Sequence, residues 1–182
     1  MTGAPRSVCV YCSSSASVDE VFLDAARALG RGLAERGHQL VWGGATVGLM
    51  GEVSRTARAG GSRTVGVIPE SMLAREIADH EADELIVTAD MSSRKAEMER
   101  RSDAFIALPG GFGTLEELLE QITLRLLRFH DKPIVLVDVD GFWQPLLTLF
   151  DHVVDGRFAR PDSRAAYAVA GDPASALALL DP

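Results

Sequence analysis

The sequence predicts an α/β protein built on a doubly wound, mostly parallel sheet. Short apolar segments rich in Val, Ile and Leu alternate with amphipathic segments along the chain. Strands that are apolar throughout are typical of a parallel sheet with helices on both faces. We expect a single domain over residues 1–182, because a chain of 182 residues is long enough to bury a core without disulfides or metals.

Most of the expected strands are followed by a segment with helical periodicity. The expected strands are Val8–Cys12, Gln39–Trp42, Thr64–Ile68, Glu84–Thr88, Ala104–Leu108, Pro133–Val137 and Ala166–Val169. The expected helices are Val18–Arg36, Leu49–Ala59, Met91–Arg101, Thr114–Arg128 and Gly141–Val154. This alternation predicts a Rossmann-like sheet, in which ligands bind beyond the carboxyl ends of the strands. We expect the tail after Asp172 to be dispensable.

Composition argues against several classes of partner. The formal net charge is −8, whereas nucleic-acid binding needs an excess of Lys and Arg on one face. No apolar run approaches the 18 or so residues of a membrane span, and the amino-terminal residues lack the apolar region of a signal peptide. We therefore predict a cytoplasmic protein with neither a nucleic-acid nor a membrane partner.

Cys9 and Cys12 are the only cysteines, and both fall within an expected strand. Side chains three residues apart on a strand point to opposite faces, so we interpret both thiols as buried structural groups rather than a redox pair. The four histidines are scattered without metal-ligand spacing, and we expect them on the surface or in loops, with no metal site.

Three loops of small or polar residues leave the carboxyl ends of expected strands, and we expect them to meet in one crevice. They are residues 13–15, 43–51 and 109–117. The second has the glycine spacing of a phosphate-binding P-loop without its Lys-Ser/Thr, and the third lacks the last glycine of a dinucleotide fingerprint, so both standard nucleotide sites are disfavoured. Each glycine loop is compatible with a tight turn or with amides that bind a phosphate.

The third loop reads PGGFGTLEE from Pro109 to Glu117 and raises a problem of charge. One interpretation is a capping box, in which Thr114 caps a helix and Glu117 reaches back to the capping residue's amide. The other is a carboxylate beside a bound phosphate, which requires a cation between the two. Arg94 or Lys95, on the same helical face as Met91 and Met98, is the candidate for that cation.

These motifs resemble those of the LOG ("Lonely guy") family of cytokinin riboside 5′-monophosphate phosphoribohydrolases, which are often mislabelled lysine decarboxylases. Residues 109–117 match the family signature P-G-G-x-G-T-x-x-E, and residues 91–98 match its companion M-x-x-R-K-x-x-M. The resemblance extends from Cys9 to about Phe158.

The resemblance implies hydrolysis of the N-glycosidic bond of an N6-modified adenosine monophosphate, giving the free base and ribose 5-phosphate. It implies no metal or organic cofactor, and a homodimer with the site near the subunit interface. By motif, it implies that Arg94 and Glu117 are catalytic. The residues it implies for substrate binding are Glu76, Lys95, Gly110, Gly111, Phe112, Gly113, Thr114 and Thr123.

The chain departs from the family pattern near the region expected to shape the base pocket. Ser13 replaces a glycine of many members, Ser92 and Ser93 replace His-Glu, and Leu124 and Arg128 replace Trp and Gly. Two alternatives therefore stay open: a broad AMP or purine-nucleotide nucleosidase, and a noncatalytic nucleotide or cofactor carrier. Lysine decarboxylation is disfavoured, because nothing in the chain resembles a pyridoxal phosphate site.

Overall fold

The computed structural model describes residues 4–73 and 77–180. Strands, α-helices (α) and 3-10 helices (η) follow one another in the expected alternation. They are β1 (Ser7–Tyr11), α1 (Glu20–Glu35), β2 (Gln39–Trp42), α2 (Gly48–Ala59), β3 (Thr64–Pro69), α3 (Glu70–Leu73), β4 (Glu84–Thr88), α4 (Met91–Arg100), β5 (Ala104–Ala107), α5 (Phe112–Leu126), β6 (Ile134–Val137), η1 (Val139–Gly141), α6 (Gln144–Asp155), η2 (Pro161–Ala166), β7 (Ala168–Ala170) and α7 (Pro173–Ala178).

The strands form one seven-stranded sheet in the order β4-β3-β2-β1-β5-β6-β7. Each neighbouring pair of these strands is parallel, which confirms the predicted Rossmann-like sheet. From β1 the chain moves through α1 to β2 on one side, and from β5 it moves through α5 to β6 on the other. The carboxyl ends of β1 and β5 therefore mark the point where strand order reverses, which is where such sheets bind ligands.

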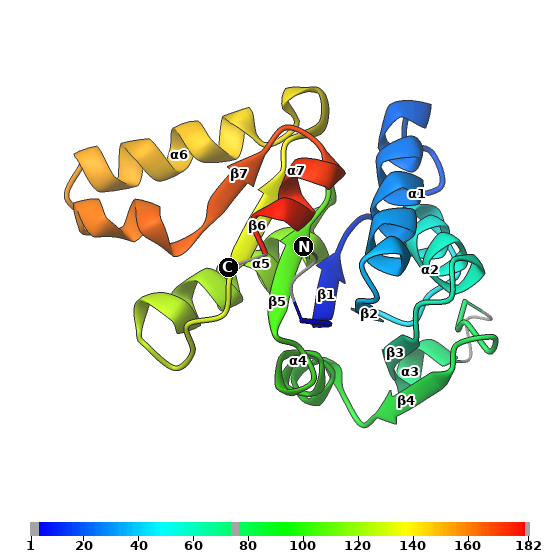
Figure 1. Ribbon diagram of the computed structural model, residues 1–182. Coiled ribbons are helices and arrows are strands. Elements are labelled where there is room, and N and C mark those ends of the chain that lie inside the picture. The colour runs from blue at the N-terminus through cyan, green and yellow to red at the C-terminus, as the bar shows by residue number, and fades with distance from the viewer. Residues whose placement is uncertain (1–3, 74–76, 181–182) are drawn as a thin grey trace.

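Helices cover both faces of the sheet and define two apolar clusters (Figure 1). One cluster joins the sheet to α1, α2 and α7, and the other joins it to α4, α5 and α6. Residues of β1 alternate between the two, with Val8 and Val10 in the first and Cys9 and Tyr11 in the second. This alternation is the period of two that an extended strand imposes on its side chains.

The two cysteines lie on opposite faces of the sheet, as predicted, and both are buried free thiols. Burial raises the pKa of Cys9 to about 12, and it raises the pKa of Cys12 as well. Thiols that stay protonated are poor nucleophiles, which fits a structural role. His38 lies in the loop between α1 and β2, within the prediction of surface or loop positions, although it is buried and accepts a hydrogen bond from the Arg6 amide.

The prediction that the tail after Asp172 is dispensable was wrong. The Asp172 side chain accepts a hydrogen bond from the Ser175 amide and so caps the short helix α7. Ala176, Leu177 and Leu180 are buried in the cluster that α7 shares with α1. A helix of six residues has little periodicity, and its stability comes from this packing rather than from helix propensity.

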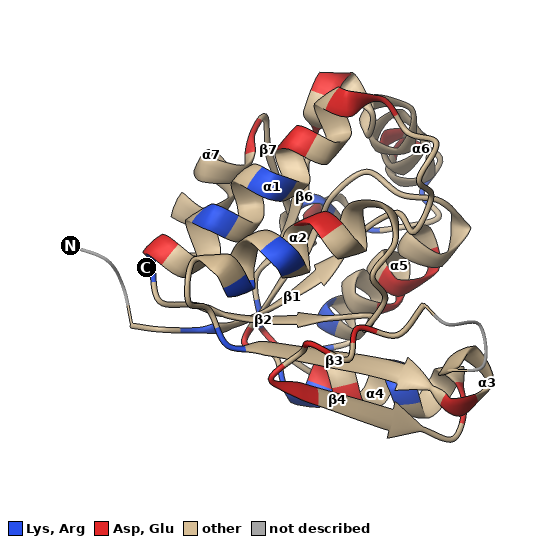
Figure 2. Cartoon of the chain, turned by 90° about the vertical axis from the view of Figure 1, so that its right-hand side faces the viewer, with Lys and Arg blue, Asp and Glu red and all other residues tan. Residues whose placement is uncertain are grey.

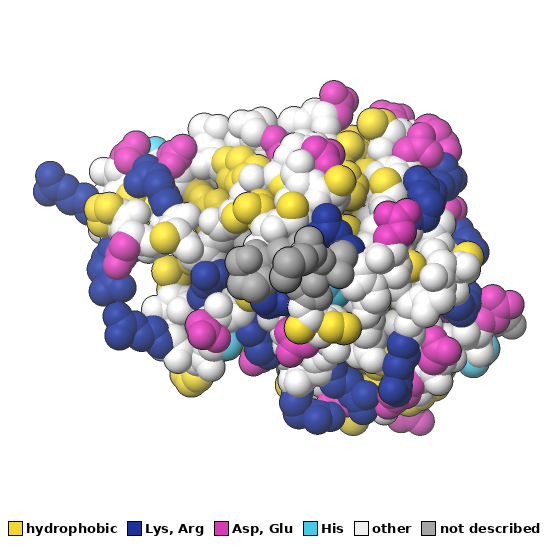
Figure 3. Space-filling model, in the orientation of Figure 1, with side chains coloured by type: hydrophobic (Ala, Val, Ile, Leu, Met, Phe, Trp, Pro, Cys, Tyr) yellow, Lys and Arg dark blue, Asp and Glu magenta, His cyan; other side chains and the backbone are white. Residues whose placement is uncertain are grey.

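Figures 2 and 3 show acidic and basic side chains interspersed on the sides of the molecule that they present. Within the described ranges, no helix combines the length and apolar character needed to cross a membrane.

We predict that Leu177→Ala lowers the free energy of unfolding by about 2–5 kcal/mol, because it empties a fully buried site between α7 and α1. Urea denaturation measures this change. Leu179→Ala, at the residue that ends α7, is the matched control, because Leu179 is 49% exposed and its truncation should cost under about 0.5 kcal/mol. Equal effects of the two substitutions would mean that the tail is not part of the core.

Candidate functional site

A cavity of about 480 Å³ lies at the carboxyl edge of the sheet, the edge towards which the arrows of β3 and β4 point in Figure 2. Its volume is within the range of about 300–1,000 Å³ that is usual for small-molecule sites. The three loops predicted to converge all line it, together with residues of α3, α4 and α5. The lining residues are Cys12, Ser13, Ser14, Ser15, Gly43, Ala45, Val47, Met50, Met72, Ile77, Met91, Arg94, Gly111, Phe112, Gly113, Thr114, Glu116 and Glu117.

The first of the two glycine loops is closed by packing within the protein. The amides of Leu49 and Met50, at the start of α2, both donate to the carbonyl oxygen of Ser13, at 3.0 and 3.4 Å. Gly48 has a φ of +56°, and a Cβ there would lie 2.6 Å from the carbonyl carbon of Ser14. A glycine is thus needed for the two loops to approach, and the first amides of α2 are already used.

The second glycine loop opens α5 towards the cavity. The first hydrogen bond inside this helix runs from the Leu115 amide to the Gly111 carbonyl at 3.0 Å. The amides of residues 112–114 come before that bond, so they have no acceptor within the helix. These residues line the cavity, and the free amides and the helix dipole together make the start of α5 suited to an anion.

The capping-box interpretation of this loop was wrong. The residue before α5 is Gly111, and no side chain caps the helix. Thr114 lies two residues inside the helix, where its side chain packs against Gly110. Because α5 starts earlier than predicted, Glu117 is too far along the helix to reach the capping residue's amide.

Glycines 111 and 113 leave open space beside the cavity. A Cβ added at either residue would meet no described atom within 4 Å, and neither residue has a positive φ. Neither backbone strain nor packing within the protein explains a glycine at these positions. Both positions leave room for a group to approach the backbone.

The Arg94 guanidinium and the Glu117 carboxylate form a buried ion pair at the inner end of the cavity. Arg94 Nη1 donates to Glu117 Oε1 at 2.7 Å, and both residues are about 95% buried. Arg94 Nε also donates to the Val67 carbonyl oxygen at 3.0 Å. A Cβ on Gly43 would lie 2.1 Å from Arg94 Nη2, so glycine is required there to make room for the guanidinium.

Burial raises the pKa of Glu117, and the positive charge of Arg94 opposes that rise. An isolated carboxylate in such a place would take up a proton, whereas pairing with a guanidinium favours its ionised form. The pair therefore holds a negative charge in a poorly solvated site, where electrostatic interactions with a ligand are stronger than in water. The cation that the sequence required beside Glu117 is Arg94.

Helix α4 is fixed at its start by a reciprocal cap. The Asp90 carboxylate accepts the Ser93 amide at 2.8 Å, and Ser93 Oγ accepts the Asp90 amide at 3.1 Å. Ser93, one of the departures from the family pattern, therefore has a local role in setting the helix start. From that start, Arg94 and Met98 are the residues of α4 that become buried.

Lys95 pairs with acidic side chains of α5. Its Nζ contacts Glu116 Oε1 and lies 3.2 Å from Glu120 Oε2. The hydrogen bond to Glu116 raises the pKa of Lys95. Lys95 thus links α4 to α5 next to the Arg94–Glu117 pair, although it does not line the cavity.

The remaining predicted site residues occupy different positions. Phe112 is at the mouth of the cavity and is 92% exposed. Gly110 lines a separate apolar cavity of about 310 Å³ behind the loop. Thr123 is exposed further along α5, where its hydroxyl donates to the Leu119 carbonyl at 2.7 Å. Glu76 falls outside the described residues.

Three features of the cavity had no prediction from sequence. The Val67 carbonyl gives no sequence signal, because any residue supplies a backbone oxygen. Gly43 lay within a predicted loop, but its contact with Arg94 depends on how two distant segments pack. Met50, Met72 and Met91 come from three separate elements, so only folding brings them to the same cavity.

The chain is thus a Rossmann-like α/β protein with an open helix start and a buried Arg–Glu pair at the switch point of its sheet, where proteins of this class bind ligands. Among residues 4–73 and 77–180, no group of three or more His, Cys, Asp or Glu side chains is arranged to hold a metal ion. The family model described as "Possible lysine decarboxylase" matches residues 50–180.

Sequence comparison with curated relatives identifies the family of this chain. The chain is 49% identical over 159 residues to cytokinin riboside 5′-monophosphate phosphoribohydrolase LOG7 of Arabidopsis thaliana, covering 87% of this chain and 73% of the relative. It is 47% identical over 159 residues to LOG3 of the same plant, covering 87% and 74%. The chain belongs to the LOG family of phosphoribohydrolases.

Solved structures share the fold at lower identity. The Moco carrier protein of Chlamydomonas reinhardtii superposes with a TM-score of 0.74 and 26% identity, covering 97% of this chain and 95% of that one. A molybdenum cofactor binding protein of Rippkaea orientalis has a TM-score of 0.73 and 23% identity, with 97% and 95% covered. The second likeness shows the fold alone.

We predict that Gly113→Ala weakens the binding of inorganic phosphate at least about tenfold, because the new methyl group occupies space beside the free amides of α5. Stability should stay the same or rise by up to about 1 kcal/mol, because alanine favours a helix more than glycine does. Chemical-shift titration with phosphate measures the first effect, and urea denaturation the second.

Gly171→Ala is the matched control, because a Cβ there also meets no described atom within 4 Å but the residue lies before α7, away from the cavity. It should leave phosphate binding unchanged. If Gly113→Ala also binds phosphate normally, the start of α5 is not the anion site.

Proposed function

We propose that the chain hydrolyses the N-glycosidic bond of cytokinin riboside 5′-monophosphates, which are N6-modified adenosine monophosphates. Water adds to the ribose C1′, the bond from C1′ to the purine breaks, and the products are the free base and ribose 5-phosphate. The buried Arg94–Glu117 pair beside the open start of α5 is the observation that carries this proposal. Relatives at 47–49% identity that are named for this activity support it.

The 5′-phosphate of the substrate would bind at the start of α5. The amides of residues 112–114 would donate to its oxygens, and Gly111 and Gly113 let the phosphate approach the backbone. This contact is present throughout the reaction, so it serves mainly to bind and orient the nucleotide. It fixes the ribose near the next turn of α5, which carries Glu117.

Glu117 would act on the sugar as the bond to the base breaks. Cleavage of a glycosidic bond passes through an oxocarbenium-like state with positive charge on the ribose ring. The Glu117 carboxylate is complementary to that charge, which is absent in the bound ground state, so its interaction lowers the barrier. We assign it the further role of orienting the attacking water.

Arg94 would act through electrostatics rather than proton transfer. A guanidinium stays protonated over the working pH range and is therefore a poor general acid. Its bond to Glu117 holds the carboxylate ionised and in place, while Nη2 beside Gly43 faces the cavity, where the phosphate or the departing base would lie.

The methionine side chains support a base that carries an apolar substituent. Three of the five methionines of the chain, Met50, Met72 and Met91, line the same cavity. Methionine is flexible and polarisable, and it packs well against aromatic rings and apolar chains of varied shape. Unmodified AMP offers such a wall only its purine ring, whereas an isoprenoid group adds apolar surface for it to cover.

Two alternatives compete with this proposal. A broad purine-nucleotide nucleosidase would use the same residues without needing a substituent on the base. A noncatalytic carrier is favoured by the fold similarity to the Moco carrier protein at 26% identity. The higher identity to phosphoribohydrolases and the presence of both Arg94 and Glu117 favour an enzyme.

Chromatography of reactions with AMP and with isopentenyl-AMP distinguishes the three. We expect free base from the prenylated nucleotide at least about tenfold faster than from AMP, because burying the prenyl group against the methionine wall adds favourable apolar contact. Equal rates would support the broad nucleosidase. Binding of both nucleotides with no release of base would support the carrier.

We predict that Glu117→Gln lowers turnover of isopentenyl-AMP at least about 100-fold, because the substitution removes the charge that stabilises the oxocarbenium-like state. The wild-type rate should fall as pH drops through the pKa of Glu117, which burial raises above the ordinary value of 4.5. The residual rate of the Gln variant should lack this acidic limb, since glutamine does not titrate.

Glu120→Gln is the matched control, since Glu120 is one turn further along α5, contacts Lys95 and does not line the cavity. It should keep turnover within about twofold of wild type. A Gln variant of Glu117 with the turnover and pH profile of wild type would contradict the catalytic assignment.

We also propose that the protein is a cytoplasmic homodimer with the site near the subunit interface. The predicted apolar pattern on and after α5 leaves Leu119 and Phe129 exposed, at 41% and 73%, where a partner would cover them. Burying such side chains on association is favourable. A sedimentation-velocity measurement that finds only monomer at micromolar concentration would overturn the proposed dimer. Recovery of the protein in a membrane or secreted fraction would overturn the proposed cytoplasmic location.

A further inference from the structure

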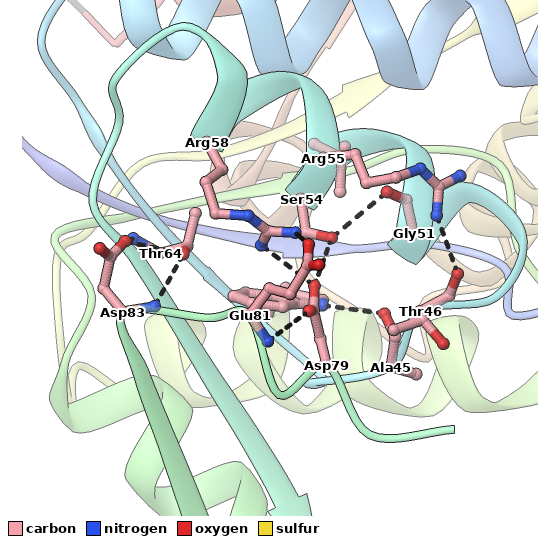
Figure 4. A network of polar contacts seen from close by, with 12 residues as sticks. Ala45, Thr46, Gly51, Ser54, Arg55, Arg58, Thr64, Asp79, Glu81 and Asp83 are labelled. Atoms are coloured by element: carbon pink, nitrogen blue, oxygen red, sulfur yellow. Dashed lines mark hydrogen bonds and ion pairs between the residues drawn. The ribbon is translucent and has the colours of Figure 1, made fainter. Parts of the chain in front are cut away.

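A buried aspartate lies outside the cavity and takes no direct part in the chemistry proposed above. Asp79 is 2% exposed and precedes β4 in the chain. Its Oδ2 accepts hydrogen bonds from Ser54 Oγ at 3.1 Å and Arg58 Nη1 at 3.2 Å, both on α2 (Figure 4). Its Oδ1 accepts the Glu81 amide at 3.1 Å. These bonds satisfy the carboxylate, so it is not itself a ligand site.

The backbone around Asp79 is joined to the glycine loop that borders the cavity. The Asp79 amide donates to the Gly44 carbonyl at 2.8 Å, and the Thr46 amide donates to the Ile77 carbonyl at 2.8 Å. Ala45 and Ala78 form an antiparallel bridge between these two bonds. The segment 77–79 is therefore joined to residues 44–46 by an isolated antiparallel bridge.

This paired segment forms part of the cavity. Ala45 and Ile77, one from each side of the bridge, both line it, and Gly43 at the start of the loop contacts the Arg94 guanidinium. The Asp79 carboxylate connects the segment to α2, whose own start is tied to the Ser13 carbonyl. A bridge of so few backbone bonds has little stability alone, so the side-chain link determines where the segment sits.

We propose that Asp79 is a positioning residue for nucleotide binding: through Ser54 and Arg58 it holds the Gly44–Thr46 loop and Ile77 in the place that shapes the cavity wall. The wall contacts the substrate in both ground and transition states, so its displacement weakens binding uniformly. This inference rests on the proposed function for the identity of the ligand. It assigns no chemical step to Asp79.

The test is Asp79→Asn, which keeps the shape of the side chain and removes its charge. We expect the KM for isopentenyl-AMP to rise about tenfold while kcat stays within about twofold. The dissociation constant of AMP, measured by calorimetry, should rise by the same factor. An Asp79→Asn enzyme that is less stable but has wild-type KM and AMP affinity would overturn the proposal and leave Asp79 a purely structural residue.

Asp83→Asn is the matched control for loss of stability. Asp83 accepts the Thr64 amide at 2.7 Å and the Thr64 hydroxyl at 2.9 Å, in the same polar region of Figure 4, without touching the glycine loop. It should lower the unfolding temperature and leave KM unchanged. Equal rises in KM for Asp79→Asn and Asp83→Asn would also overturn the proposal.

Arg58→Gln supplies a second variant should Asp79→Asn fail to fold. The Arg58 side chain is 22% exposed, so its replacement is easier to accommodate than that of a fully buried residue. In this variant the Asp79 carboxylate keeps its hydrogen bonds to the Ser54 hydroxyl and the Glu81 amide. For this variant we expect KM to rise, by a smaller factor than for Asp79→Asn, and an unchanged KM would count against the proposal.

The proposed function and the role of Asp79 can fail separately. If the wild-type protein binds AMP but releases no base, the proposed hydrolysis fails, while the AMP affinities of the variants still test the role of Asp79.

Discussion

The buried ion pair between Arg94 and Glu117 is the interaction on which the site depends. Each charged side chain would be costly to bury alone, because an unpaired charge in the interior loses its hydration without compensation. The pair persists because Arg94 also donates to the Val67 carbonyl and because Gly43 leaves room for its guanidinium. The residues that hold the ion pair thus come from β3, α4, α5 and the loop after β2. The shape of the cavity depends on these four segments staying in contact.

The two glycine loops illustrate how one residue type serves two physical purposes. Gly48 is required by the protein itself, since its φ is positive and a side chain would strike the neighbouring loop. Gly111 and Gly113 meet neither condition, and the space beside them opens to the cavity. The first loop closes the fold, and the second leaves amides available for an anion. A carboxylate one turn further along α5 then suits a ligand that is anionic at one end and becomes cationic in the middle as it reacts.

Ligand selectivity would arise from different residues than the chemistry. The ion pair and the start of α5 are polar and fixed by hydrogen bonds, whereas Met50, Met72, Met91 and Ile77 give the same cavity an apolar part. A polar site rejects a poorly matched group strongly, while an apolar wall discriminates by only a few kcal/mol and adapts to shape. Asp79 connects the two regions, since the segment it anchors carries Ile77 and pairs with the loop that follows Gly43.

The sequence by itself determined the sheet, its parallel direction and the convergence of three loops, because apolar runs and helical periodicity are local signals. It also indicated that a carboxylate at Glu117 needed a cation, and it offered Arg94 or Lys95. Tertiary structure alone decided between them: Arg94 forms a buried ion pair with Glu117, while Lys95 pairs with Glu116 and Glu120 of α5. It also placed Thr114 inside α5 rather than at its cap, and it made α7 part of the core. These outcomes depend on which distant atoms come within a few ångströms, and no local pattern of residues encodes that distance.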